Sequence, residues 1–277
     1  MLKIGKYNRL QVARMVDFGL YLATESGKEV LLPMRYVTDE MNVGDEVEVF
    51  VYTDSEDRPI ATTDVPHATV GEFAYMQVRD VNSFGAFLDW GIAGKDLLVP
   101  YSQQKSRMKV GGTYLVYVYL DHATMRVAAT AKIAHYLGNV IPEYKVGQKV
   151  DALVVEQTPI GYRVIVDNLH RGMIYENETY SALSIGERLS AYVKSVREDG
   201  KIDISMGDIA PRRVVSLSDR VLKAIQAHGC PFTLTDKSSP DEIRERFACS
   251  KKDYKKALGH LYKEGKITIS DEKITLA

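Results

Sequence analysis

The feature that most constrains the fold of this chain is a short pattern that occurs three times. Each copy is an apolar stretch containing a glycine, at 16–22, 81–89 and, in degenerate form, 159–166. These landmarks shift by about 66 and then by about 76 residues, which indicates an internal structural repeat. Apolar–glycine pairs recur in step with them, at 4–5, 70–71 and 146–147, and again at 43–44, 110–111 and 185–186.

Each repeat predicts a small β-barrel. In the second copy, strands rich in Val, Tyr and Phe are expected at 72–81, 85–89, 95–100, 113–120 and 126–131, separated by Gly, Asp and Ser. Five short strands in about 65 residues favour closure as an OB-type barrel, which hides the sheet edges. We therefore expect a mainly β chain with an α/β tail. It comprises tandem five-stranded OB-fold barrels over 1–66, 67–139 and 140–210, and a different domain over 211–277.

Two aromatic residues, Phe84 and Phe87, flank Gly85 in the second copy. Glycine inside a strand marks a bulge, a bend or a close backbone approach, and around a bulge both rings can reach the outer surface. There they would stack on unpaired bases. The alternative is that one or both rings belong to the core, as most apolar strand residues do. Because position 87 is matched by Tyr21 and Arg163, whereas position 84 is apolar in all copies, Phe87 is the expected stacking ring and Phe84 is expected to be partly buried.

The formal net charge of −1 hides an asymmetry along the chain. Residues 1–66 carry 7 basic and 12 acidic side chains, and residues 140–210 carry 8 and 11. Residues 67–139 carry 7 and 5, and residues 211–277 carry 14 and 9. A polyanion is therefore expected to be attracted to the second repeat and the tail, and to be repelled by the first repeat.

The second repeat resembles the S1 RNA-binding domain, the OB-fold repeat of ribosomal protein S1 and polynucleotide phosphorylase. The resemblance rests on residues 70–72, 84–88, 98–100, 110–111 and 121–128. It implies RNA-facing side chains at matching positions of all copies. These are Phe84, Phe87, Asp121 and Arg126 in the second repeat, Phe18, Tyr21, Asp54 and Arg58 in the first, and Ile160, Arg163 and Lys201 in the third.

The sequence departs from the S1 pattern on the third strand, where the family usually has histidine. Pro33, Pro100 and Tyr175 stand at this position, with Tyr101 following Pro100. The third repeat has also lost both strand-two aromatics, although Arg163, Arg171, Tyr175 and Lys201 leave a basic, partly aromatic face possible. Beside the expected face of the second repeat lie three cations that either contact RNA or simply solvate a loop: Lys105, Arg107 and Lys109.

The tail predicts a winged helix, a relative of the helix-turn-helix. Helices are expected from Ser218 to Gly229, with Val221, Leu222 and Ile225 on one face, from Ser239 to Phe247, and from Ser250 to Glu264. The third helix is expected to bury Tyr254, Leu258, Leu261 and Tyr262, and a hairpin turning at Asp271 and Glu272 follows it.

The third helix of the tail begins with four lysines, Lys251, Lys252, Lys255 and Lys256. Without Arg, Asn or Gln near its start, this helix favours phosphate contacts over base reading. The alternative is an exposed helix that the lysines merely solvate. The spacing of His228, Cys230, Cys249 and His260 fits no usual zinc pattern, so no metal or other cofactor is expected.

Three S1-like repeats followed by a winged helix resemble the bacterial conserved virulence factor B family of RNA-binding regulators. The resemblance implies a non-enzymatic protein that binds single-stranded or unstructured RNA and regulates gene expression. A DNA-binding regulator that uses the winged helix on a duplex is the alternative. A ribonuclease is disfavoured, because the chain has no phosphate-binding glycine loop, clustered metal carboxylates or nucleophile motif.

Two cysteines cannot form a disulfide framework, which favours a reducing cytoplasm. Neither an apolar run of about 20 residues nor a signal peptide is found, so no membrane partner is expected. The sequence does not indicate an oligomeric state.

Overall fold

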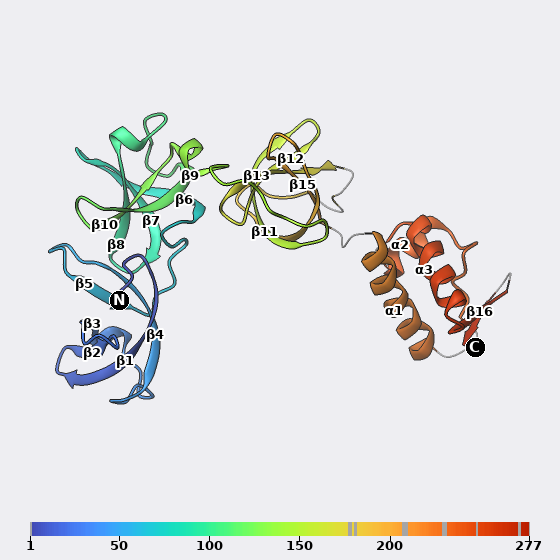
Figure 1. Cartoon of the computed structure of the whole chain (residues 1–277), viewed down its shortest axis with the longest axis horizontal. Coiled ribbons are helices and arrows are strands. Elements are labelled where there is room, and N and C mark those ends of the chain that lie inside the picture. The colour runs from blue at the N-terminus through green and yellow to red at the C-terminus, as the bar shows by residue number, and fades with distance from the viewer. Residues whose placement is uncertain are drawn as a thin grey trace.

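The computed structural model describes residues 2–176, 179, 182–206, 210–228, 232–247, 249–270 and 273–276, with the side chains of 210–216 and 228 left out of the description. Across these residues the chain forms three five-stranded β-barrels followed by a small helical domain (Figure 1). The predicted fold class is therefore confirmed.

The first barrel consists of β1 (Lys6–Val16), β2 (Gly19–Ala23), β3 (Glu29–Pro33), β4 (Glu46–Thr53) and β5 (Pro59–Thr62). Its strands close in the order β1-β2-β3-β5-β4, with β3 and β5 parallel and the other pairs antiparallel. Alternate residues such as Leu20, Leu22 and Leu32 fill the interior, because successive side chains of a strand point to opposite faces.

The second barrel consists of β6 (Phe73–Val81), β7 (Gly85–Ile92), β8 (Lys95–Pro100), β9 (Thr113–Asp121) and β10 (Arg126–Thr130). These bounds agree with the expected strands to within one residue, except that β7 continues to Ile92. The sheet runs β10-β9-β6-β7-β8 and is not fully closed by strand pairing. Instead, Gln103 after β8 accepts hydrogen bonds from Ala131 and Thr130 at the end of β10.

The third barrel consists of β11 (Lys149–Thr158), β12 (Gly161–Val166), β13 (His170–Tyr175), β14 (Arg188–Val196) and β15 (Ile202–Ser205). It closes in the same order as the first barrel, β11-β12-β13-β15-β14. In each barrel the first strand carries a register shift at the same place, after Val12, Val78 and Val154. The repeat in the sequence is therefore a repeat in structure down to its bulges.

Neighbouring barrels are packed against each other. Phe50 of the first barrel is fully buried with its ring 5.4 Å from that of Trp90 in the second. Between the second and third barrels, the Tyr75 hydroxyl donates to the Val155 carbonyl at 2.7 Å, and Phe73 packs with Ile165. These contacts make continuous apolar junctions along the row of barrels.

The helical domain contains α1 (Ala210–His228), α2 (Pro240–Phe247) and α3 (Lys251–Lys263), followed by β16 (Ile267–Ile269) and β17 (Ile274–Leu276). Ser239 and Ser250 cap α2 and α3 as predicted, each accepting a backbone N–H three residues later. The turn expected at residues 271–272 lies outside the described residues.

Two expectations for this domain are wrong. Ser218 does not cap α1, which begins eight residues earlier at Ala210; it is buried and donates to the Ala257 carbonyl at 3.2 Å. Tyr262 does not join the core, because it lies on the exposed side of α3, and Ala257 occupies the buried stripe instead.

Within the described residues, no helix is long and apolar enough to cross a membrane.

Candidate nucleic-acid interface

The outer surface of the second barrel carries both rings that flank Gly85. Along β7, Ala86, Leu88 and Trp90 point into the barrel and are buried. Phe87 lies on the opposite face and is half-buried. Phe84 precedes the strand, in a loop tip whose backbone is held by the Asn82 side chain, which accepts the Phe84 N–H at 2.8 Å.

The three matching loop tips all expose an apolar side chain. Phe18 is 57% exposed, Phe84 71% and Ile160 60%. The expectation that Phe84 is the more buried of the two rings is therefore wrong. The residue is apolar in each copy although it stands before the strand begins, beyond the barrel wall, where no core can cover it.

The glycine after each loop tip is required by a close backbone approach. A Cβ on Gly19, Gly85 or Gly161 would lie 2.1–2.2 Å from a carbonyl oxygen of the next strand. The first position of β2, β7 and β12 therefore accepts no side chain, and the loop tip is held at a fixed place. The close approach that glycine indicated is confirmed, whereas the bulge lies on the preceding strand.

Tyr101 extends the aromatic surface of the second barrel. It begins the short 3₁₀ helix η2 (Tyr101–Gln103), and its hydroxyl donates to the Asn82 carbonyl at 2.6 Å, which ties it to the loop of Phe84. The Arg107 guanidinium lies 3.8 Å from the centre of the Tyr101 ring. Lys105, Arg107 and Lys109 are all exposed. Tyr101 and Arg107 thus lie beside the loop of Phe84.

The predicted site of the first barrel is partly occupied by its own side chains. Tyr21 lies edge-on to Phe18, and the Arg14 guanidinium covers its ring at 3.8 Å. Arg58 is paired with the carboxylates of Asp54 and Glu56 at 2.9 and 2.8 Å. The positive charge of Arg58 is therefore largely neutralised by its own barrel.

Asp121 and Arg126, which the resemblance assigns to the RNA-facing surface, both make contacts within the protein. Asp121 accepts hydrogen bonds from Ala123 and Thr124 in its own turn, and these bonds hold its pKa below the ordinary value. Arg126 binds Asp57 of the first barrel, and this bond lowers the pKa of the Asp57 carboxyl. Both groups are exposed, so the pair adds little stability, and Arg126 can exchange it for another anion.

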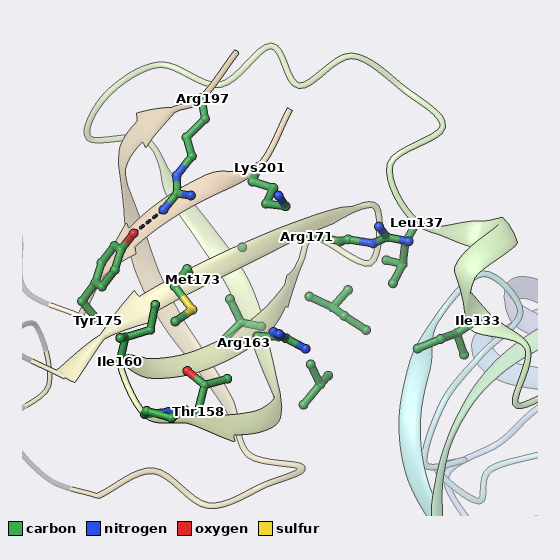
Figure 2. A pocket seen from close by; sticks show the side chains of 15 residues that line it. Ile133, Leu137, Thr158, Ile160, Arg163, Arg171, Met173, Tyr175, Arg197 and Lys201 are labelled. Atoms are coloured by element: carbon green, nitrogen blue, oxygen red, sulfur yellow. Dashed lines mark hydrogen bonds between the residues drawn. The ribbon is translucent and has the colours of Figure 1, made fainter. Parts of the chain in front are cut away.

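The third barrel, despite its degenerate sequence, has a hollow of about 720 Å³ on the same face (Figure 2). Arg163, Tyr175 and Lys201, which the resemblance assigned to one face, all line it. Arg163 is paired with Glu156 at 2.6 Å and Lys201 with Asp199 at 2.5 Å. The Lys201 bond lowers the pKa of Asp199.

Sequence reasoning missed Arg197, which also lines this hollow. The Arg197 guanidinium donates to the Tyr175 hydroxyl (Figure 2) and to the Asp203 carboxylate. The bond to Asp203 raises the pKa of Arg197. The signal was present: Arg197 stands in the third barrel where Asp54 and Asp121 stand in the other two, as their matching turn contacts show. A substitution of arginine for aspartate between repeats marks a change in what the face can bind.

The lysines of α3 lie at its N-terminal end, as predicted. Lys252 and Lys256 are exposed, Lys255 lies 3.5 Å from Asp236, and Lys251 donates to the Lys237 carbonyl at 3.4 Å. On the opposite side Tyr254 is fully buried. Within the described part of the chain, no group of three side chains is placed to hold a metal ion; Cys230 and the His228 side chain lie outside it.

Comparison with known protein families gives matches at both ends of the chain. A family model of the S1 domain matches residues 4–64 and 70–132, which hold the first two barrels. A model of the CvfB-like winged helix domain matches residues 219–276.

Relatives extend over nearly the whole chain. The protein YitL of Bacillus subtilis is 30% identical over 273 residues, 95% of this chain and 90% of YitL. Conserved virulence factor B of Staphylococcus saprophyticus is 25% identical over 282 residues, 99% of this chain and 94% of that protein. A solved structure of a multidomain protein with nucleic acid binding domains from Streptococcus pneumoniae covers 99% of this chain and 98% of its own, at 24% identity and a TM-score of 0.41.

Proposed function

This chain belongs to the conserved virulence factor B family, and we propose that it binds single-stranded RNA in the bacterial cytoplasm and thereby regulates gene expression. Its S1 and winged helix domains are of the nucleic-acid-binding type, and we propose no catalytic role for them. The observation that carries the proposal is the exposed ring of Phe84, held at a fixed loop tip to which Tyr101 is hydrogen-bonded, with the Arg107 guanidinium on the Tyr101 ring.

Single strands fit this surface better than duplexes do. An exposed ring can stack on a base only where the base is not already paired and stacked in a helix. The nearby cations Lys105, Arg107 and Lys109 would follow the phosphates of such a strand. On the winged helix, exposed Lys252 and Lys256 supply phosphate contacts without base choice. We therefore assign base stacking to the barrels and phosphate binding to both parts.

The contributions of the repeats are expected to differ. We assign 1–66, 67–139 and 140–210 to the three S1-like domains and 211–277 to the winged helix. The first domain is acidic, its Arg58 is paired with two carboxylates, and Arg14 covers one of its rings. It should therefore contribute least to the binding of a polyanion.

Titration of the full chain against a labelled, unstructured RNA of about 16 nucleotides tests the proposal, since single OB folds engage roughly 4–16 nucleotides. We expect micromolar or tighter binding whose affinity falls steeply as salt rises, because bound lysines and arginines displace counterions. The matched control is duplex DNA at equal salt. Absence of RNA binding at low salt, or an affinity indifferent to salt, would overturn the proposal. Preference for the duplex would support DNA regulation instead.

A further inference from the structure

The far end of the binding face is closed in the first two barrels by ion pairs. On β3, Glu29 is bound by Arg14 at 2.8 Å. At the matching position of β8, Asp96 lies 3.4 Å from Arg79, which also binds Asp89 at 3.0 Å. A carboxylate therefore stands at this end of both faces and occupies the arginine there, which leaves that arginine less available to an anionic ligand.

The third barrel reverses the charge at this position. Strand pairing sets Ile165 opposite Arg171, in the register that joins Asp89 to Asp96 in the second barrel. Arg171 is exposed and lines the hollow. Arg79 is the bulge residue of β6 in the second barrel, and Val155 occupies the matching position of β11 in the third. An arginine and two apolar residues thus replace a closed cluster of ion pairs.

The charge of Arg171 is available to a ligand. The other cations of the hollow are engaged: Arg163 with Glu156, Arg197 with Asp203 and Lys201 with Asp199. Arg171 has no side-chain partner among the residues that the structure describes. A guanidinium presents a planar set of donors that matches the oxygens of a phosphate.

The hollow is completed by the segment that joins the second and third barrels. Leu137 packs with Ile165, and Ile133 lies across the hollow from Met173 and Ile160 (Figure 2). This segment contains the 3₁₀ helix η3 (Ile133–Tyr136), whose Tyr136 ring stacks on Tyr117 of the second barrel at 3.9 Å. The apolar wall is therefore held by both barrels, and the hollow is incomplete without the second.

We propose that this hollow binds one unpaired nucleotide, with its base against the apolar side chains that line the hollow and its phosphate on Arg171. The inference rests on the proposed function and adds where and how one nucleotide is held. A volume of about 720 Å³ lies within the roughly 300–1,000 Å³ of small-ligand sites. Its apolar walls receive the faces of a base, and Arg171 and Arg163 both point toward the wall formed by Leu137 and Ile133 (Figure 2).

Ile133 also connects the hollow to the second barrel. Ile133 also lines a smaller hollow of about 220 Å³ on that barrel, together with Lys105 and Met108. A strand whose nucleotide occupies the larger hollow can pass over Ile133 toward Lys105. The site then joins the two barrels along one strand.

The test compares Arg171→Gln with Lys149→Gln in the full chain. Lys149 is an exposed cation of the same barrel outside the hollow, so both variants lose one charge. Loss of one phosphate contact should lower the slope of log affinity against log salt by about 0.7 in the Arg171 variant alone. An Ile160→Ser variant should bind RNA about tenfold more weakly with little change in melting temperature, whereas Ile141→Ser, at an exposed position outside the hollow, should not.

Competition by adenosine 5′-monophosphate distinguishes a nucleotide within a strand from a free one. If the mononucleotide competes with RNA for the wild-type protein but not for Arg171→Gln, the hollow accepts a free nucleotide. If RNA binding depends on Arg171 but the mononucleotide does not compete, the hollow holds a nucleotide only as part of a strand. If wild-type protein binds RNA but both hollow variants match their controls and the mononucleotide has no effect, the inference fails while the proposed function stands. Failure of wild-type protein to bind any RNA refutes the proposed function itself.

Discussion

Replacing Phe84 by Ala should reduce RNA binding while leaving the barrel folded. Phe84 is 71% exposed, so 29% of its surface (100 − 71) is covered. For a residue of roughly 200 Å², at about 25 cal/mol per Å², the covered part is worth at most about 1.5 kcal/mol of stability. A buried phenylalanine would cost about 3–5 kcal/mol on truncation. Loss of one base stack, by contrast, costs about 1–3 kcal/mol of binding, or roughly 5- to 150-fold in affinity.

The assay is an RNA titration and a thermal or urea unfolding curve on the same variant. Leu88→Ala is the matched control, because Leu88 lies on the same strand but is fully buried; it should lose about 2–5 kcal/mol of stability. Phe87→Ala should lose some of both quantities, since its ring is half-buried. Unchanged RNA affinity in a folded Phe84→Ala variant would refute the stacking role, whatever its stability.

Three further predictions follow from the geometry. Changing Lys252 and Lys256 together to Gln should lower the slope of log affinity against log salt by about 1.4 for single-stranded RNA, as measured by titration, and an unchanged slope would mean that these lysines only solvate α3. His170 is buried, and burial lowers its pKa in the folded state, so the unfolded chain takes up a proton at this residue first as pH falls. The stability of the protein should therefore decline below about pH 6.5, and it should decline less in His170→Gln. Melting curves of both proteins at about pH 7.5 and 5.5 measure the difference. Gly85→Ala should destabilise by more than about 1 kcal/mol in urea unfolding, because its Cβ would meet the Val99 carbonyl; near-native stability would contradict the close approach.

The sequence by itself determined the domain types, because the features that define them are local or periodic. Apolar–glycine landmarks at a common spacing predicted the repeated barrels, and runs rich in Val, Tyr and Phe predicted the strands of the second barrel to within one residue, except at the end of β7. Ser239 and Ser250 predicted the starts of α2 and α3, since an N-cap acts on backbone groups only three residues away. The predicted start of α1 was wrong because it depends on a distant contact: Ser218, which resembles a cap in the sequence, donates to the Ala257 carbonyl of α3.

Tertiary structure alone decided how available each side chain is. Phe84 is apolar in a pattern that resembles a core position, yet it stands beyond the end of the barrel wall, and this depends on where Gly85 meets the next strand. Arg126 matches the family pattern, but Asp57 from another barrel occupies it. The hollow of the third barrel needs the segment of Ile133 laid across it, and that placement follows from packing between barrels. Contacts between residues far apart in the chain depend on how folded domains dock, which no local pattern or repeat period records.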